Sequence, residues 1–308
     1  MDLPALEELQ RSFARKADEF KDIVKAGRTH LMDAVPVTLG QEFAGYAAQV
    51  GEGIERVRAA LPRVGKLALG GTAVGTGLNA HPEFAARVRE RVAAATGLAL
   101  APPAHPFEAQ GARDALVELS GALKTVAVSC TKIANDIRWM GSGPRAGLGE
   151  LVLPELQKGS SIMPGKVNPV MCEVLTQVAA QVVGNDAAIT VGGLSGNFEL
   201  NVYVPLLARN LLQSIVYLAN ACRAFADKCV AGVAADAERA YQLAEQTLVL
   251  VTALTPAVGY DLATAISQEA AASGRSLREV ALESGVDADV LDKALDLRAA
   301  AHGNGFAD

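Results

Sequence analysis

The chain has 308 residues and a formal net charge of −6, and half of its residues are hydrophobic although only 5% are aromatic. This length is enough to bury a large core, and it predicts a main domain plus a smaller one. The many alanines and few aromatic residues favour closely packed helices over a sheet. The negative charge, with no stretch where lysine and arginine concentrate, argues against a nucleic-acid partner.

The four cysteines are spread over helical patterns, and their spacings match no zinc or iron–sulfur motif. They are Cys130, Cys172, Cys222 and Cys229. We therefore expect buried thiols in a reducing cytoplasm and no metal site. The N-terminus has no signal-peptide pattern, and no apolar run without polar residues reaches membrane-spanning length. These features predict a soluble cytoplasmic protein with no membrane partner.

Helical periodicity begins near the N-terminus. Apolar residues recur every three or four positions from Leu6 to Val24, which predicts a helix closed by Gly27. Residues 27–36 are interpreted as a polar turn, and a second helix is expected after Gln41.

A glycine-rich run at residues 70–77 follows the second helix. It predicts a tight connecting loop, because no lysine follows it as a phosphate-binding loop requires and no strand precedes it. The longest helix is predicted from Glu108 to Trp139, and two further long helices are expected to begin at Pro169 and near Asn201. The helix near Asn201 is predicted to have an apolar stripe, which consists of Leu207, Leu211, Ile215, Leu218, Cys222 and Phe225.

Beyond about Asp236 the helical pattern shortens. Glycines and a proline divide it into brief helices, and Ser276 and Glu279 have the spacing of a capping box. We therefore predict a central helical-bundle domain over residues 1–236 and a small C-terminal helical domain over residues 237–308.

The segment Gly159–Pro169 gathers polar groups between two helical patterns. It contains the hydroxyls of Ser160 and Ser161, the amine of Lys166 and the amide of Asn168. The helix that follows is predicted to start at its proline with Asn168 as cap, and a helix start suits a carboxylate ligand. Taken alone, the segment is better interpreted as an ordinary polar loop between helices.

This segment, Gly-Ser-Ser-Ile-Met-Pro-Gly-Lys-Val-Asn-Pro, resembles the flexible active-site loop of the fumarase/aspartase superfamily. A second block, Gly-Arg-Thr-His-Leu-Met-Asp-Ala-Val-Pro at residues 27–36, also resembles that superfamily, and the two blocks occur in the family's order. The resemblance implies an all-α fold, with a long-helix bundle as the central domain, and a homotetramer. It also implies an enzyme that eliminates across a C–C bond beside a carboxylate.

The resemblance assigns roles to seven residues. It implies Ser160 as catalytic base, His30 as the residue that handles the water or leaving group, and Glu173 as the carboxylate that orients His30. The substrate-binding residues that it implies are Thr29, Ser161, Lys166 and Asn168. Without the resemblance, His30 is interpreted as a surface residue of a turn and Glu173 as a solvent-facing helix residue. The resemblance calls for no metal and no organic cofactor.

Other blocks separate the members of the superfamily. Phe-Glu-Ala at residues 107–109, Asn-Asp-Ile-Arg-Trp at residues 135–139 and Gly-Asn-Phe-Glu-Leu-Asn at residues 196–201 resemble class II fumarase. They favour reversible hydration of fumarate to L-malate through an aci-carboxylate intermediate, with a small dicarboxylate as substrate. Aspartate ammonia-lyase is the alternative activity.

The resemblance departs from the family at one point, because the chain begins where the family's second domain begins. The absent N-terminal domain carries blocks that bind the substrate carboxylates, and each family site is built from three subunits. Three alternatives follow for the chain. It is a fragment of a longer enzyme, it works with a separate chain that carries the N-terminal part, or it is a catalytically inactive structural homologue.

Overall fold

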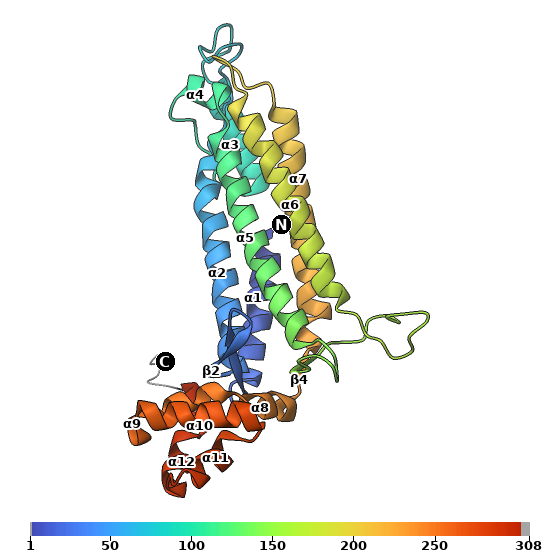
Figure 1. The fold of residues 1–308 in the computed structure, drawn as a ribbon. Helices are drawn as coiled ribbons and strands as arrows, with labels where there is room; N and C mark the ends of the chain where they lie inside the picture. Colours follow the sequence, from blue (N-terminus) through green and yellow to red (C-terminus); the bar gives the residue numbers. More distant parts are fainter. Residues whose placement is uncertain (1, 303–308) are drawn as a thin grey trace. The chain divides into compact units, whose positions relative to one another are not determined.

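The computed structural model describes residues 2–302, which are mainly helical, as the all-α prediction requires (Figure 1). The chain forms two compact units. The first comprises Met1–Ser12, Ala47–Asp136 and Asn168–Cys229, and the second comprises Phe13–Tyr46, Ile137–Val167 and Val230–Asp308. The predicted domain boundary at residue 236 stays a prediction.

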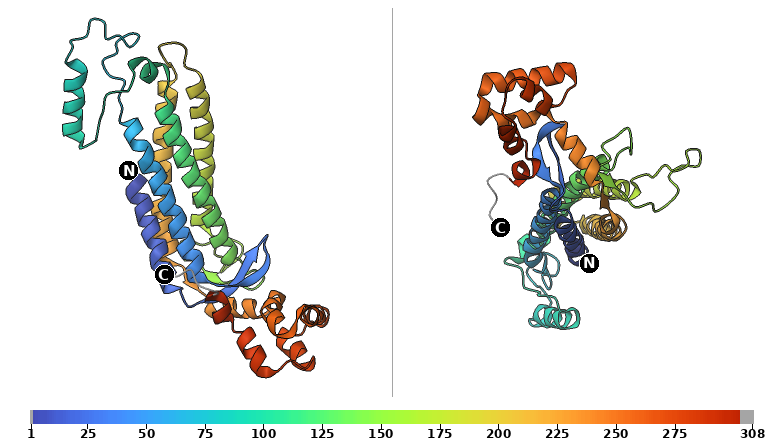
Figure 2. Two further views of the ribbon diagram at one scale, coloured as in Figure 1. Left: turned by 90° about the vertical axis from the view of Figure 1, so that its left-hand side faces the viewer. Right: turned by 90° about the horizontal axis from the view of Figure 1, so that it is seen from below.

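The helices that contribute to the first unit include the longest of the described chain. They are α1 (Asp2–Glu19), α2 (Leu39–Val64), α3 (Phe84–Thr96), α4 (Pro106–Gly111), α5 (Asp114–Met140), α6 (Val170–Leu194) and α7 (Val204–Lys228). Three of these helices, α1, α2 and α5, continue into the second unit. In Figures 1 and 2, α5, α6 and α7 run side by side. Figure 2 shows that α3 stands apart from them, and α3 buries no residue.

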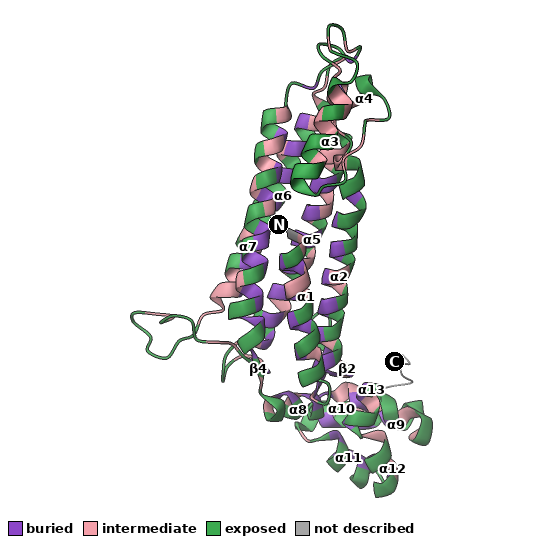
Figure 3. Cartoon of the chain, turned by 180° about the vertical axis from the view of Figure 1, so that it is seen from behind, coloured by how far each residue is buried: buried purple, intermediate pink, exposed green. Residues whose placement is uncertain are grey.

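The close packing of α6 on its neighbours follows from its small residues. A Cβ at Gly192 would meet the Leu207 side chain of α7 at 2.8 Å, and one at Gly193 would meet Val117 of α5 at 2.7 Å. Buried residues form stripes along α6 and α7, with exposed residues on the other faces of both helices (Figure 3). The predicted apolar stripe of α7 is confirmed, since Ile215 is partly buried and the other five residues are buried: Leu207, Leu211, Leu218, Cys222 and Phe225.

The four cysteines are buried free thiols, as the sequence predicts. Cys229, at the end of α7, hydrogen-bonds with Cys172 in the first turn of α6. This hydrogen bond and burial raise the pKa of the Cys229 thiol above its ordinary value. A thiol held protonated in this way is a poor nucleophile.

The prediction of one helix from Glu108 to Trp139 is wrong. The structure divides it into α4 and α5, with Ala112 in an extended conformation between them. The cause is a close backbone approach, because a Cβ at Gly111 would lie 2.4 Å from the Phe198 carbonyl oxygen. Only glycine fits against that carbonyl.

The second unit corrects the interpretation of residues 20–38. Helix α1 ends at Glu19 rather than at Gly27, and the polar turn is an antiparallel hairpin of β1 (Val24–Thr29) and β2 (Met32–Thr38). The β-branched residues and the proline of this stretch favour extended backbone. The pairing register shifts after Ala26, where Gly27 comes so close to the Val35 carbonyl that a Cβ would lie 2.4 Å from its oxygen.

The rest of the second unit contains a short strand pair and brief helices. They are β3 (Leu151–Val152), η1 (Val230–Gly232), β4 (Ala234–Ala235), α8 (Ala237–Glu245), η2 (Leu248–Leu250), α9 (Val251–Val258), α10 (Tyr260–Ser273), α11 (Leu277–Glu283), α12 (Ala288–Ala294) and α13 (Leu297–His302). The predicted brief helices and the capping box of Ser276 and Glu279 are confirmed. The apolar residues of the helices from α8 to α13 form one core with Val24 and Ala26 of β1. No helix within residues 2–302 is long and apolar enough to cross a membrane.

Candidate active site

The hairpin carries Thr29 and His30 at its exposed tip. Because Thr29 pairs with Met32, the turn consists of His30 and Leu31, whose φ angles are 56° and 61°. Two-residue hairpin turns often require this left-handed backbone at both positions, and they usually use asparagine or glycine there. A histidine and a leucine in these conformations store backbone strain, which is common at functional sites.

A buried charge cluster, formed by Lys25, Arg28, Glu42 and Glu150, holds the strand that leads to this tip. Arg28 donates to both carboxylate oxygens of Glu150, at 3.0 Å to Oε2 and 2.9 Å to Oε1. The Lys25 side chain is 2% exposed, donates to Glu42 Oε1 at 2.9 Å and lies 3.7 Å from Glu150 Oε2. Two cations therefore neutralise two carboxylates at a site largely removed from water.

The segment that follows β3 carries Ser160, Ser161 and Lys166, and Figure 1 shows it as an open loop. The Ser160 hydroxyl oxygen accepts the backbone N–H groups of Ile162 at 3.2 Å and Met163 at 3.1 Å. Donors placed in this way favour the ionised form of a hydroxyl. Ser161 and Lys166 are exposed, so both side chains are available to a ligand.

Asn168 and Glu173 lie at the start of α6. The predicted cap position is wrong: Pro169, not Asn168, is the N-cap residue of α6, and the Pro169 side chain makes no capping hydrogen bond. Proline is tolerated there because the N–H groups at a helix start have no intrahelical acceptor. Glu173 lies in the first turn, where a carboxylate is favoured by the helix dipole.

The seven predicted site residues therefore fall in three places: the hairpin tip, the loop after β3 and the start of α6. In the part of the chain that the structure describes, no hydrogen bond or ion pair joins Thr29 or His30 to Ser160 or Lys166. Their assignment to one site stays a prediction.

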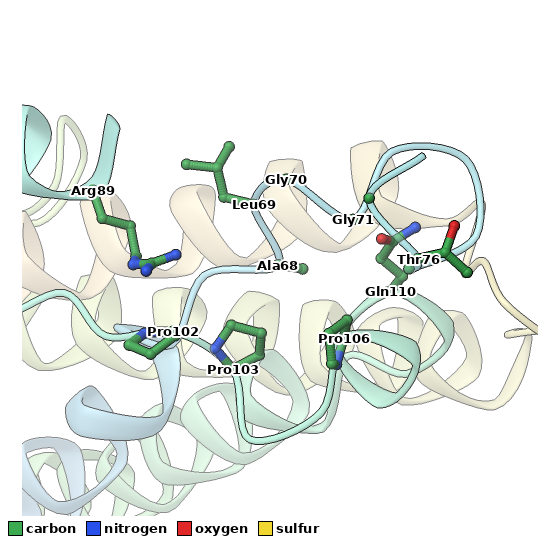
Figure 4. Close-up of a pocket in the computed structure, with 12 residues that line it drawn as sticks. Ala68, Leu69, Gly70, Gly71, Thr76, Arg89, Pro102, Pro103, Pro106 and Gln110 are labelled. Carbon is green, nitrogen blue, oxygen red and sulfur yellow. The ribbon is translucent and has the colours of Figure 1, made fainter. Parts of the chain in front are cut away.

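The glycine-rich run at residues 70–77 forms a tight loop in the first unit, as the sequence predicts. The Gly71 carbonyl accepts the Gly75 N–H at 2.9 Å, and buried Gln110 donates to two other carbonyls of the loop, at 3.4 and 3.5 Å. The loop borders a cavity of about 310 Å³, on which Arg89 and Gln110 also lie (Figure 4). None of the seven predicted site residues lines this cavity.

Sequence reasoning assigned no role to Arg28 or Glu150. Arg28 stands inside the second superfamily block, next to Thr29, and that position was an available signal. Glu150 lies 122 residues away from Arg28 and stands in neither of the two superfamily blocks, so only the fold reveals their contact.

Comparison with known proteins identifies the family. Residues 2–184 match the family described as Lyase, and residues 250–300 match the family described as Fumarase C C-terminus. The class II fumarate hydratase of Mycobacterium tuberculosis is 57% identical over 305 residues, which cover 97% of this chain and 64% of that protein. The mitochondrial fumarate hydratase of Danio rerio is 57% identical over 283 residues, covering 92% of this chain and 56% of that protein.

Solved structures agree with this result. A fumarate lyase:delta crystallin from Brucella melitensis superimposes with a TM-score of 0.94 at 43% identity, over 98% of this chain and 66% of that one. A class II fumarase from Schistosoma mansoni gives a TM-score of 0.90 at 37% identity, over 97% and 66%. The chain thus spans less than two thirds of the length of the curated relatives that it matches. The chain belongs to the lyase family, in the branch of the class II fumarate hydratases.

Proposed function

We propose that the protein hydrates fumarate reversibly to L-malate. The observation that carries this proposal is the Ser160 hydroxyl, which accepts two backbone N–H groups within a loop of the class II fumarase pattern. High identity to class II fumarate hydratases supports it, and no feature favours the aspartate ammonia-lyase alternative. The substrate is a small dicarboxylate.

The chemistry requires a strong base and a stabilised dianion. In the dehydration direction, ionised Ser160 takes the proton from the carbon beside a malate carboxylate, and the electron pair moves into that carboxylate to give the aci-carboxylate. The electron pair then returns from the aci-carboxylate to form the C=C bond of fumarate as the C–O bond on the neighbouring carbon breaks, and His30 supplies a proton to the departing hydroxyl, which leaves as water. Lys166 stabilises the extra negative charge of the intermediate.

The other site residues bind and orient. Glu173 accepts a hydrogen bond from His30 and fixes its ring, as a carboxylate partner does in other acid–base sites. Thr29, Ser161 and Asn168 bind the substrate carboxylates. None of these steps requires a metal or an organic cofactor.

We also propose that the site is completed in a homotetramer. Large apolar side chains are exposed on the long helices of the first unit, among them Val191 on α6 and Leu212 on α7, which are 58% and 60% exposed. Apolar surface of this kind on long helices is typical of subunit interfaces. A cytoplasmic location fits the four free thiols.

The test of the proposed function is the ultraviolet absorbance of the fumarate double bond. The purified chain is assayed with malate and, separately, with aspartate, both alone and mixed with the N-terminal portion of a class II fumarate hydratase. Fumarate formed from malate supports the proposal, whereas fumarate formed only from aspartate supports the ammonia-lyase. If neither substrate is converted in either mixture, the structural-homologue interpretation replaces both.

A further inference from the structure

We infer that Glu150 is a positioning residue that acts through Arg28 to hold the Thr29–His30 turn in place. The inference rests on the proposed role of His30, to which it adds the group that fixes the backbone before the turn. Glu150 itself contacts no reacting atom.

The contact between Glu150 and Arg28 is suited to orienting a strand. The guanidinium and the carboxylate meet through two parallel hydrogen bonds, at 3.0 and 2.9 Å. This fork fixes the angle as well as the distance between the two groups, which a single contact from a lysine cannot do. The Glu150 side chain is fully buried and that of Arg28 is 16% exposed, so water competes little for either group.

Glu150 is a rigid support because its backbone is bonded on both sides. Its N–H donates to the Met140 carbonyl and its C=O accepts the Asp236 N–H, each at 2.9 Å. The next residue, Leu151, pairs with Ala235 in the β3–β4 ladder. The Glu150 backbone is therefore fixed to the fold independently of the hairpin.

The turn needs such support. His30 and Leu31 both have left-handed backbones, and strained conformations persist only where the surrounding structure enforces them. The tip offers little packing of its own, because Leu31 and Met32 are 71% and 69% exposed. Arg28, two residues before His30, is partly buried and the last residue of β1 before the exposed tip.

The charge balance of the cluster determines which variants are informative. Removing the Glu150 charge leaves Lys25 and Arg28 facing Glu42 alone, which can prevent folding. Arg28→Lys keeps the positive charge but loses the two-pronged geometry. The matched control is Arg239→Lys, since the Arg239 side chain donates to the Leu148 and Gly147 carbonyls beside Glu150 and, within the described residues, hydrogen-bonds to no hairpin residue.

The experiment combines two measurements on Arg28→Lys, Glu150→Gln and Arg239→Lys in the catalytically competent assembly. Amide hydrogen exchange followed by mass spectrometry reports the protection of residues 24–38 and, for comparison, of α2. Steady-state kinetics report kcat and KM for malate.

In Arg28→Lys and Glu150→Gln we expect protection at residues 28–33 to fall at least about tenfold while α2 is unchanged. We also expect kcat to fall by about tenfold to a hundredfold, more than KM rises, because a small displacement of an acid–base group slows the chemical step. Arg239→Lys should change neither quantity in this way.

Unchanged exchange at residues 28–33 in Arg28→Lys overturns the inference, whether or not Glu150→Gln folds. A general loss of protection that includes α2 also overturns it, since the contact would then stabilise the fold rather than the turn. Increased exchange at residues 28–33 with undiminished kcat supports the positioning role of Glu150 but contradicts the proposed catalytic role of His30. Failure of the inference and failure of the proposed function therefore give different results.

Discussion

The Ser160 hydroxyl oxygen lies 3.1 Å from the Met163 backbone nitrogen and accepts its N–H group. A serine hydroxyl is ordinarily too weak an acid to ionise near neutral pH, so a catalytic serine needs donors that favour the alkoxide. The Ile162 N–H is a second such donor, at 3.2 Å. In the proposed mechanism these two donors favour the alkoxide that abstracts the proton, and closure of the loop on a substrate would strengthen the effect by excluding water.

Replacing Ser160 by alanine removes the proposed base. We expect kcat for malate dehydration to fall by at least about 10²- to 10⁴-fold, the usual contribution of a general base. The oligomeric state should be unchanged, because the substitution removes a single hydroxyl from a partly exposed loop. Absorbance assays and analytical ultracentrifugation measure the two quantities.

The control for this variant is Ser195→Ala, which removes an exposed hydroxyl that donates to the Val191 carbonyl at the end of α6. It should retain parental turnover. If Ser160→Ala is as active as Ser195→Ala, Ser160 is not the base.

Hydrophobic periodicity is sufficient to predict the elements that depend on neighbours within one helical turn. The stripe of α7 and the capping box at Ser276 depend on neighbours three or four residues away, and both are correctly predicted. The break between α4 and α5 depends on Gly111 meeting Phe198, a contact across 87 residues that no local pattern encodes.

The same limit applies to the candidate site. The loop around Ser160 and the block around His30 are recognisable because each is contiguous in sequence. The hairpin that carries His30 was missed, since its strands are short and Gly27 is also typical of a helix end. Glu150 was missed because its partner Arg28 is remote in sequence.

The Gly27→Ala substitution tests the hairpin geometry. An added Cβ would lie 2.4 Å from the Val35 carbonyl oxygen, a backbone atom that cannot move without shifting the pairing. We expect a loss of about 1–3 kcal/mol in the free energy of unfolding, as for other overpacked sites, together with a lower kcat. Gly45 is an exposed residue of α2 where an added Cβ meets nothing within 4 Å. Gly45→Ala should therefore raise the free energy of unfolding by roughly 0.5–1 kcal/mol. Equal effects of the two variants in urea unfolding would contradict the hairpin register.

The Asp186→Ala substitution tests the polar contacts inside the first unit. Asp186 is buried on α6, and it accepts hydrogen bonds from Ser120 at 2.7 Å and Lys124 at 2.6 Å, both on α5. The variant leaves the Ser120 hydroxyl unpaired, but Lys124 is half-exposed and can turn to solvent. We therefore expect a cost of about 1–3 kcal/mol in urea unfolding. Glu52→Ala, at an exposed position of α2, should change stability by less than about 0.5 kcal/mol.

The Leu212→Glu substitution tests the proposed assembly. Leu212 is 60% exposed on α7 within the single chain, and a carboxylate there would be costly to bury against another subunit. We expect the variant to remain helical by circular dichroism but to sediment as a smaller species and to lose turnover. Leu282→Glu on α11, where the parent side chain is 45% exposed, is the control. Retention of the parental sedimentation coefficient by Leu212→Glu would exclude this face from the interface.

The capping box of α11 predicts a pH dependence with a definite sign. The Ser276 backbone N–H, followed by its hydroxyl, donates to Glu279 and holds the pKa of that carboxyl below its ordinary value of 4.5. Because the folded-state pKa is lowered, the carboxylate contributes stability that is complete above about the unfolded pKa and disappears as the pH falls through the folded value. Glu279→Gln should therefore unfold more easily than the parent protein near pH 7, and the difference should vanish as the pH falls through the lowered folded-state pKa of Glu279. A ¹³C NMR titration of Glu279 should have its midpoint below 4.5 and move upward in Ser276→Ala. A stability difference that is constant over this pH range would mean that the charge of Glu279 contributes nothing to the cap.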